Sequence, residues 1–504
     1  MEPSDLSIAR ARRQSLGDLL HRTAQRFPGR LAALDDCDPR LEPCRQRTFH
    51  ELNADANRIA HALIARGIQP GDRVALLARN GLPYVQAIFG VAKAGAVLVP
   101  INFMLGGGEV GYVLHHSGAV GLLVQDELHA TAEDAIRAAD VGAALRVRAV
   151  LGSLGRDEAP DGWEPFSALT GDVGDADPGD PDIAIASDAP AQLMYTSGTE
   201  SRPKGAMLSH EALIANYSTC IIDGEMQSDD IELHALPLFH VAQQHVFLGP
   251  DIQLGTSSVI LPAPDPATVL EAIERHHVTK FFAPPTVWIG LLRHPDFDTR
   301  DLSSLRKGYY GAAIMPVEVL RELSARLPNV RLWNFYGQTE MAPLATVLKP
   351  EDQLRKAGSA GRAALNVETR IVGPDGERLP AGEVGEIVHR SPHAIHGYLD
   401  DPERTAEAFA GGWFHSGDLG VADDEGYITV VDRIKDMIKT GGENVASREV
   451  EEAIYAHDAV AEVAVVGIPH PQWIEAVIAV YVPREGATVD AAELTAHCRK
   501  QLAG

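Results

Sequence analysis

The chain has 504 residues, enough for two to four domains of ordinary size and a sizeable buried core. Apolar residues make up 45% and charged residues 23%, a composition that excludes wholesale disorder. The 44 Lys and Arg against 70 Asp and Glu give a net charge of −26. Neither nucleic acid nor an anionic membrane is therefore expected as a partner, since both require a basic surface.

Neither the cysteines nor the apolar stretches mark a secreted or membrane protein. None of the four cysteines belongs to a CxxC pair, which leaves no disulfide framework and no zinc or redox motif. The N-terminus lacks the apolar run of a signal peptide, and the apolar stretch 84–99 contains Lys93 and two glycines and is too short to span a bilayer. We therefore expect a cytoplasmic protein with no transmembrane segment.

The first part of the chain alternates between helix-like and strand-like segments. Apolar residues three to four apart predict a helix over 47–68, and Pro70-Gly71 then leads into an apolar strand. Strand–helix–strand units of this kind pack as parallel αβ layers with right-handed crossovers. The same rhythm recurs in the helix-like 84–95 and 265–277 and in the strand-like 96–101, 146–151, 257–261 and 279–285.

Later segments change in character. Residues 171–183 are rich in Gly, Pro and Asp and are expected to be a flexible surface connection, whereas 366–431 contain the short runs and turns of a β-rich layer. We expect an α/β fold with a large N-terminal domain of several subdomains, 1–432, built from αβ layers and the β-rich layer. A small mobile α+β lid, 433–504, should follow, and it is expected to be incomplete because the chain ends in a helix-like stretch.

One loop has the composition of a polyphosphate-binding segment. It reads Met194-Tyr-Thr-Ser-Gly-Thr-Glu-Ser-Arg-Pro-Lys-Gly205 and lies between two strand-like runs. Backbone N–H groups, hydroxyls and the ammonium of Lys204 are the groups that bind phosphate oxygens. Only nine of the 44 basic residues are lysines, which strengthens the case for Lys204. The spacing is not that of a P-loop, and a polar surface turn is the alternative for the loop taken alone.

The loop resembles the signature of the adenylate-forming superfamily, which includes acyl-CoA synthetases, nonribosomal peptide adenylation domains and luciferases. Four more segments match this family in the same order. They are Tyr336-Gly-Gln-Thr-Glu340, Gly412-Trp-Phe-His-Ser-Gly-Asp418, Asp432-Arg-Ile-Lys-Asp436 and Lys439-Thr-Gly-Gly-Glu-Asn444. We expect a stand-alone acyl-CoA ligase, because no carrier domain with a modifiable serine follows in this sequence and the hinge segment reads Asp-Arg-Ile-Lys-Asp.

The resemblance implies a reaction in two steps. A carboxylic acid is joined to the α-phosphate of ATP, with release of pyrophosphate, and the acyl group then moves to the thiol of coenzyme A. Two anions meet in the first step, so cations and hydrogen-bond donors are needed, Mg²⁺ among them. The residues implied to bind the nucleotide are Thr196, Ser197, Gly198, Thr199, Lys204, Gly311, Ala312, Ala313, Tyr336, Gly337, Asp418 and Arg433.

Several residues receive individual roles from the resemblance. Glu340 is implied to hold Mg²⁺, and Thr339 to donate to the α-phosphate. Tyr336 is implied to stack on adenine, opposite the turn formed by residues 311–313. Asp418 is implied to accept the ribose hydroxyls, supported by Arg433.

The segment after residue 432 is implied to move between the two steps. Lys435 stands at the family's hinge position, and the loop behind it is implied to line the tunnel for the pantetheine arm of CoA. A plain solvent-exposed loop is the alternative. The tunnel residues are Gly441, Gly442 and Glu443.

The acyl pocket is less well defined by sequence. His240 follows Pro237-Leu-Phe, where family members often carry a gate to this pocket, and a hydrogen-bonded core histidine is the alternative of equal weight. Residues 243–249 and 308–313 are expected to bound the pocket, and the small side chains at 311–313 suggest room for a long or bulky acyl group.

The chain departs from the family pattern in three places. Glu200 and Ser201 replace the usual Thr-Gly, and a carboxylate there would repel the β- and γ-phosphates unless it points to solvent or pairs with Arg202. The family's C-terminal catalytic lysine has no match, since the context of Lys500 differs. Ile474 stands where a glycine is common.

These observations predict an AMP-forming acyl-CoA ligase that takes a carboxylic acid and CoA. The departures keep open a ligase impaired in adenylation, which makes the thioester from a preformed acyl-AMP, supplied by a partner enzyme. A stand-alone enzyme that loads a carrier protein is another alternative. A homodimer is kept as an alternative for the assembly of the protein.

Overall fold

The computed structural model describes residues 8, 11–36, 45–152, 159–171, 176–196, 202–440, 443–470, 473–484 and 486–502. They fold into two compact units. Unit 1 comprises residues 1–358, 363–368 and 391–406, and unit 2 comprises residues 359–362, 369–390 and 407–504. Most of the predicted β-rich layer therefore belongs to unit 2, whereas the predicted division between residues 432 and 433 remains a prediction.

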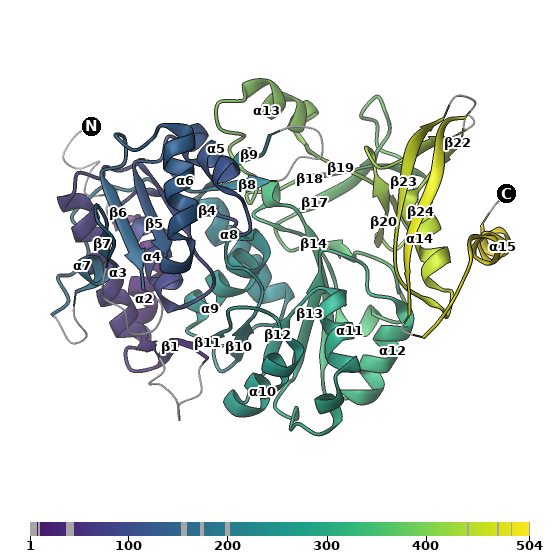
Figure 1. Ribbon diagram of the computed structural model, residues 1–504, viewed down its shortest axis with the longest axis horizontal. Helices are drawn as coiled ribbons and strands as arrows, with labels where there is room; N and C mark the ends of the chain where they lie inside the picture. Colours follow the sequence, from purple (N-terminus) through teal and green to yellow (C-terminus); the bar gives the residue numbers. More distant parts are fainter. Residues whose placement is uncertain are drawn as a thin grey trace. The chain divides into compact units, whose positions relative to one another are not determined.

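The first sheet of unit 1 has the order β7-β6-β5-β3-β4-β8-β9. Its pairings are parallel, as the strand–helix alternation predicted, except that β8 and β9 form an antiparallel hairpin. Helices α5 and α6 pack together over one face, where they bury an apolar core with the strands (Figure 1). The strands are β3 (Arg73–Leu77), β4 (Val97–Ile101), β5 (Gly121–Gln125), β6 (Val147–Leu151), β7 (Glu164–Pro165), β8 (Pro190–Thr196) and β9 (Lys204–Ser209). The helices of this region are α3 (Phe49–Ala65), α4 (Leu82–Lys93), α5 (Gly107–Ser117), α6 (His129–Ala139) and α7 (Ser167–Thr170), with the 3-10 turn η1 (Asp126–Leu128).

Helix α3 illustrates how local sequence sets a boundary. Thr48 accepts a hydrogen bond from Glu51 N at 3.3 Å, and the Glu51 carboxylate accepts one from Thr48 N at 2.7 Å. This capping box satisfies the first N–H groups and starts the helix at Phe49. The observed helix, Phe49–Ala65, is shorter than the predicted helix over 47–68. At its N-terminal end this is because residues 46–48 pair with β1 instead.

The second sheet runs from β16 (Arg362–Ala363) through β15, β14, β13, β12, β10, β11 and β1 to β2. The pairings from β1 to β14 are parallel, and β15 and β2 are antiparallel to β14 and β1, respectively. Helices α10, α11 and α12 supply much of the core on this sheet. The strands are β1 (Leu31–Asp35), β2 (Gln46–Thr48), β10 (Ile231–His234), β11 (Ser257–Ile260), β12 (Lys280–Phe282), β13 (Lys307–Gly311), β14 (Arg331–Gly337) and β15 (Leu344–Leu348). The helical segments are α2 (Leu16–Arg26), α8 (His210–Asp223), the π-helix η2 (Ala242–Leu248), α9 (Gly249–Leu254), α10 (Pro266–His276), α11 (Pro285–Arg293), η3 (Pro295–Asp298), α12 (Val317–Arg326), η4 (Thr339–Met341), η5 (Pro350–Asp352) and α13 (Pro402–Ala408).

Unit 2 contains two antiparallel sheets, with the orders β17-β18-β19-β20 and β22-β21-β24-β23. In Figure 1 the long β23–β24 hairpin stands beside α14, and the two elements share a small apolar core with α15. The elements are β17 (Glu368–Val372), β18 (Val384–Arg390), η6 (Ala410–Gly412), β19 (Phe414–Ala422), β20 (Ile428–Arg433), β21 (Ile438–Thr440), β22 (Glu443–Val445), α14 (Ser447–Tyr455), β23 (Val460–His470), β24 (Ile474–Pro483) and α15 (Ala491–Gln501).

The predicted connection over 171–183 has no regular secondary structure in its described part. It is nevertheless tied to unit 1 by polar contacts, since Asn57 donates to Asp177 at 2.8 Å and the buried Lys93 pairs with Asp180. Among the described helices, none combines the length and the apolar character that a bilayer crossing would require.

Candidate active site

The predicted phosphate loop is the connection of the β8–β9 hairpin. Thr196 is the last residue of β8 and lies opposite Lys204, the first residue of β9. The hairpin thus places the hydroxyl and the ammonium at the same end of unit 1. Ser197, Gly198 and Thr199, with Glu200 and Ser201, lie outside the described residues.

Helix α5 contacts both sides of this loop. The Tyr112 hydroxyl donates to the carbonyl oxygen of Pro203 at 3.0 Å, and His116 Nδ1 lies 2.8 Å from the Tyr195 hydroxyl. The Arg202 guanidinium lies 5.3 Å from the centre of the Tyr112 ring. The sequence did not single out this helix face, because Tyr112 and His116 belong to no motif and reach the loop only through the tertiary fold.

The Tyr336–Glu340 motif begins at the end of β14 and continues into the 3-10 turn η4. Tyr336 pairs with Thr346 on β15, and Thr339 and Glu340 start the turn. Gly337 is required here, since a Cβ at this position would overlap the carbonyl oxygen of Pro343. The motif residues are only partly buried and are accessible to a ligand.

Residues 311–313 follow the strand next to this motif. Gly311 ends β13 directly opposite Phe335, the residue before Tyr336, so the register brings together the two segments predicted to enclose adenine. A Cβ on Gly311 would overlap the backbone of Phe335. Ala312 has a φ of +64°, a left-handed conformation that is uncommon for a residue other than glycine, and both alanines are exposed. Such strain is often found at functional sites.

Tyr398 joins two of the predicted site residues, and the sequence motifs did not include it. Its hydroxyl donates to Glu340 Oε1 at 2.8 Å, and the Lys204 ammonium lies 5.0 Å from the centre of its ring. Burial, and then the charge of Glu340, raise the pKa of Tyr398, so the phenol remains a hydrogen-bond donor at neutral pH.

Unit 2 brings Asp418 and Arg433 together. They are cross-strand partners on β19 and β20, and Arg433 Nε lies 3.2 Å from Asp418 Oδ1. Asp418 is almost fully buried, whereas the Arg433 side chain is largely exposed. Next to them, Glu386 accepts a hydrogen bond from Gly417 N at 3.0 Å and contacts His415 Nδ1 at 2.8 Å, which fixes the turn before Asp418.

We compared the sequence of this chain with those of known protein families and proteins. The AMP-binding enzyme family matches residues 20–399, and the C-terminal domain of AMP-binding enzymes matches residues 449–504. The chain belongs to the AMP-binding enzyme family. It is 40% identical to a feruloyl-CoA synthase from Amycolatopsis sp. over 91% of this chain and 88% of that protein. It is 37% identical to an indoleacetate–CoA ligase from Aromatoleum aromaticum over 89% of this chain and 86% of that protein.

A solved structure supports the same assignment. The ATP-bound MatB from Rhodopseudomonas palustris is 31% identical and superimposes with a TM-score of 0.85, covering 97% of this chain and 92% of that one. This AMP-binding enzyme is accordingly an AMP-forming acyl-CoA ligase, which uses ATP and CoA. The alternatives of a carrier-loading enzyme and of an adenylation-impaired ligase are not favoured by these relatives.

Glu340 is the carboxylate that the sequence predicted to hold Mg²⁺. Glu340 presents two oxygens, one of which accepts the Tyr398 hydrogen bond. No cluster of three or more potential metal ligands is found among the described residues. Carboxylate oxygens suit Mg²⁺, which commonly binds one or two protein carboxylates together with substrate phosphates. Glu340 therefore fits the role that the sequence predicted for it.

His240 lies two residues before the π-helix η2, an irregular helical form that is frequent at functional sites. Its Nδ1 accepts a hydrogen bond from Ala242 N at 3.2 Å. The ring is accessible to water yet surrounded by many protein atoms, and this desolvation lowers the pKa of His240. A core histidine would be buried, so the exposure of the His240 ring argues against that alternative. The role of His240 as a gate to the acyl pocket remains a prediction.

The predicted hinge lies in an exposed turn of the AMP-binding enzyme. Lys435 occupies the turn over 434–436 between β20 and β21, where Asp436 N donates to Arg433 O at 3.0 Å. Among the predicted tunnel residues, Gly441 and Gly442 lie outside the described residues, and only the backbone of Glu443 is described, as part of β22.

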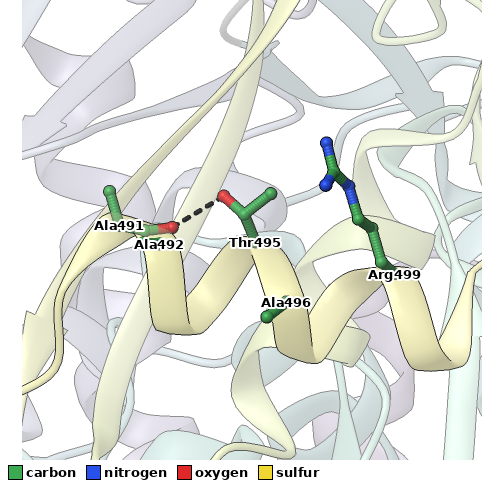
Figure 2. A pocket seen from close by; sticks show the side chains of 5 residues that line it. All are labelled: Ala491, Ala492, Thr495, Ala496 and Arg499. Atoms are coloured by element: carbon green, nitrogen blue, oxygen red, sulfur yellow. Dashed lines mark hydrogen bonds between the residues drawn. The ribbon is translucent and has the colours of Figure 1, made fainter.

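A hollow on unit 2 is lined by residues of α15 alone. Figure 2 shows the Thr495 and Arg499 side chains on the same side of this helix, with the Thr495 hydroxyl donating to Ala491 O at 2.6 Å. None of its lining residues belongs to a predicted motif. They are Ala491, Ala492, Thr495, Ala496 and Arg499.

Proposed function

We propose that this ligase activates a carboxylic acid whose acyl part carries an aromatic ring. The support comes from the two relatives above, whose names specify feruloyl and indoleacetate groups, both aromatic. A long-chain-fatty-acid–CoA ligase from Mycobacterium tuberculosis is less similar, at 35% identity. In the first step a carboxylate oxygen of the acid attacks the α-phosphorus of ATP, and the bond to the β-phosphate breaks, which releases pyrophosphate.

In this step the phosphate loop and the η4 turn act on the triphosphate. Lys204, with the hydroxyl and N–H groups of residues 196–199, binds the β- and γ-phosphates, and Thr339 donates to the α-phosphate. Glu340 holds Mg²⁺, which when bound screens the repulsion between carboxylate and phosphate. Each of these groups stabilises negative charge where it accumulates in the transition state.

The nucleoside is bound by three groups of residues. Tyr336 and Gly337 contact adenine on one side, and Gly311, Ala312 and Ala313 line the other. Asp418 accepts the two ribose hydroxyls, and Arg433 supports the same sugar. The buried carboxylate of Asp418, held by its cross-strand arginine, is suited to accept two hydrogen bonds.

In the second step the CoA thiol attacks the acyl carbonyl carbon, the bond to the AMP oxygen breaks, and AMP leaves. Lys435 marks the hinge about which the C-terminal segment turns between the steps. The tunnel for the pantetheine arm is formed by Gly441, Gly442 and Glu443. His240 gates the acyl pocket. A cytoplasmic location, a homodimer and a partner that supplies acyl-AMP stay predictions from the sequence.

The observation that supports the proposed adenylation step is that one tyrosine, Tyr398, contacts both Lys204 and Glu340, the proposed phosphate and metal ligands. The test measures pyrophosphate release and CoA consumption with ferulate, indoleacetate and palmitate, each against a control without acid. We expect kcat/KM to be at least about tenfold higher for the ring acids, a difference of about 1.4 kcal/mol in transition-state binding. Preference for palmitate would refute the proposed acid class, and absence of turnover with all acids would refute the activity.

A further inference from the structure

We propose that Tyr398 is a positioning residue that links the phosphate loop to Glu340 and holds both for adenylate formation. The proposal rests on the proposed roles of Lys204 and Glu340, and it adds a residue that contacts both of them without touching the substrate. All three residues belong to unit 1.

The two ends of the Tyr398 side chain have different partners. The hydroxyl donates to Glu340 Oε1 at 2.8 Å, which restricts the rotation of the carboxylate and leaves Oε2 for another ligand. The ring face lies 5.0 Å from the Lys204 ammonium, a cation–π distance. Tyr398 is 7% exposed, so both contacts form with little competition from water.

The backbone around Tyr398 makes the same connection. Ile395 N donates to the carbonyl oxygen of Glu340 at 2.9 Å. Two residues beyond, the chain joins the edge of β9, where Met207 N donates to Gly397 O at 3.0 Å and Leu399 N donates to Gly205 O at 2.8 Å. The segment 395–399 therefore bridges the strand that leaves the phosphate loop and the turn that carries Glu340.

Gly397 and Thr405 fix the direction of the tyrosine. Gly397 has a φ of +139°, and a Cβ at this position would lie 2.6 Å from a Thr405 carbon. Tyr398 N donates to Thr405 Oγ1 at 3.0 Å. The peptide before Tyr398 is thus held in a conformation that favours glycine, and the tyrosine ring is aimed at Lys204 and Glu340 by the backbone.

The first test replaces Tyr398 by Phe, which keeps the ring beside Lys204 and deletes only the hydroxyl bonded to Glu340. Hydrogen bonds to charged groups are strong enough that we expect acyl-AMP formation to slow about tenfold or more. Thioester formation from synthetic acyl-AMP and CoA should stay within about twofold of the wild type, because that step does not use the triphosphate. Tyr84→Phe is the matched control, since the buried Tyr84 hydroxyl has no hydrogen-bond partner among the described residues.

Binding of ATP gives a readout that does not require turnover. Isothermal titration calorimetry with ATP, in the presence and absence of Mg²⁺, measures how far the metal strengthens binding. We expect this strengthening to be at least about threefold smaller in Tyr398→Phe than in the wild type or Tyr84→Phe. If the wild type turns over no acid, this measurement still tests Tyr398, so the failure of the two proposals can be told apart.

A second variant separates the ring from the hydroxyl. Tyr398→Leu removes both contacts, and we expect its KM for ATP to rise at least about threefold above that of Tyr398→Phe, because Lys204 loses the ring. Equal slowing of both half-reactions by Tyr398→Phe, in step with a lower melting temperature, would show a merely structural role and overturn the proposal. Unchanged adenylation and unchanged Mg²⁺ dependence in Tyr398→Phe would also overturn it.

Discussion

Asp432 Oδ2 accepts two hydrogen bonds from Ser447, one from its backbone N at 2.7 Å and one from its hydroxyl at 3.1 Å. Both residues are buried. The contact ties the strand before the proposed hinge at Lys435 to the first turn of α14. A rotation about Lys435 that carries α14 away from β20 must therefore break these bonds.

This contact predicts how the hinge is held. Asp432→Ala leaves the Ser447 N–H without its acceptor, and we expect the free energy of unfolding to fall by about 1–3 kcal/mol. We also expect the rates of the two half-reactions to change unequally, since one orientation loses a stabilising contact. Thermal unfolding and separate assays with acid plus ATP and with acyl-AMP plus CoA measure both effects. Asp432→Asn keeps an acceptor and serves as the control, and an unchanged ratio of half-reaction rates in Asp432→Ala would contradict the prediction.

Glu340 is predicted to be required for the first step only. In Glu340→Ala the carboxylate for Mg²⁺ is lost, and we expect acyl-AMP formation to fall by about 10²–10³-fold, the usual loss for a group that stabilises transition-state charge. The variant should still fold, with a moderately lower melting temperature, because the Glu340 side chain is partly buried and the Tyr398 hydroxyl loses its acceptor. Pyrophosphate release measures the effect. Normal release by the folded variant would show that Glu340 is not the metal ligand.

Ile474 is predicted to destabilise the native fold. It has a φ of +71°, a conformation in which a β-branched residue is strained, and its side chain is 68% exposed and gains little from burial. Ile474→Gly should therefore raise the free energy of unfolding by about 1 kcal/mol. Ile478→Gly, on the same strand β24, should lower it, because glycine weakens a regular strand. Thermal unfolding of the two variants measures both effects. A melting temperature of Ile474→Gly below that of the wild type would refute the prediction that the backbone at Ile474 is strained.

Buried histidines predict a loss of stability in acid. Burial lowers the pKa of His210, His389 and His393 to about 4. Their pKa in the unfolded chain is about 6.5, so the unfolded state binds more protons between these values. The stability is therefore fully present above pH 6.5 and is lost as the pH falls toward 4, by an amount on the order of 1–3 kcal/mol for each histidine.

Chemical denaturation between pH 7.5 and 4.5 measures this dependence. His393→Gln, which removes one buried histidine hydrogen-bonded to Thr219, should flatten the decline, whereas replacement of the exposed His50 by Gln should not. A free energy of unfolding that stays constant over this range would contradict the prediction.

The sequence could predict the candidate site residues because they lie in short ordered motifs that resemble those of the adenylate-forming superfamily. Lys204, Glu340 and Asp418 were identified from their neighbours along the chain. The alternation of strands and helices likewise predicted the parallel sheets, since the period of the apolar residues reflects burial. Cross-strand adjacency of Asp418 and Arg433 was not predictable, as it depends on the register of β19 and β20.

Sequence alone therefore determined the kind of protein, and it predicted the chemical groups of the site, because each motif is a local pattern that resembles one of a known family. Tertiary structure decided how these groups are held. Tyr398 lies 58 residues from Glu340, and Tyr112 lies 91 residues from Pro203, so no local pattern could pair them. Their contacts exist because the strand β9, the segment 395–399 and helix α5 are brought together when the sheet and its helices bury their apolar faces.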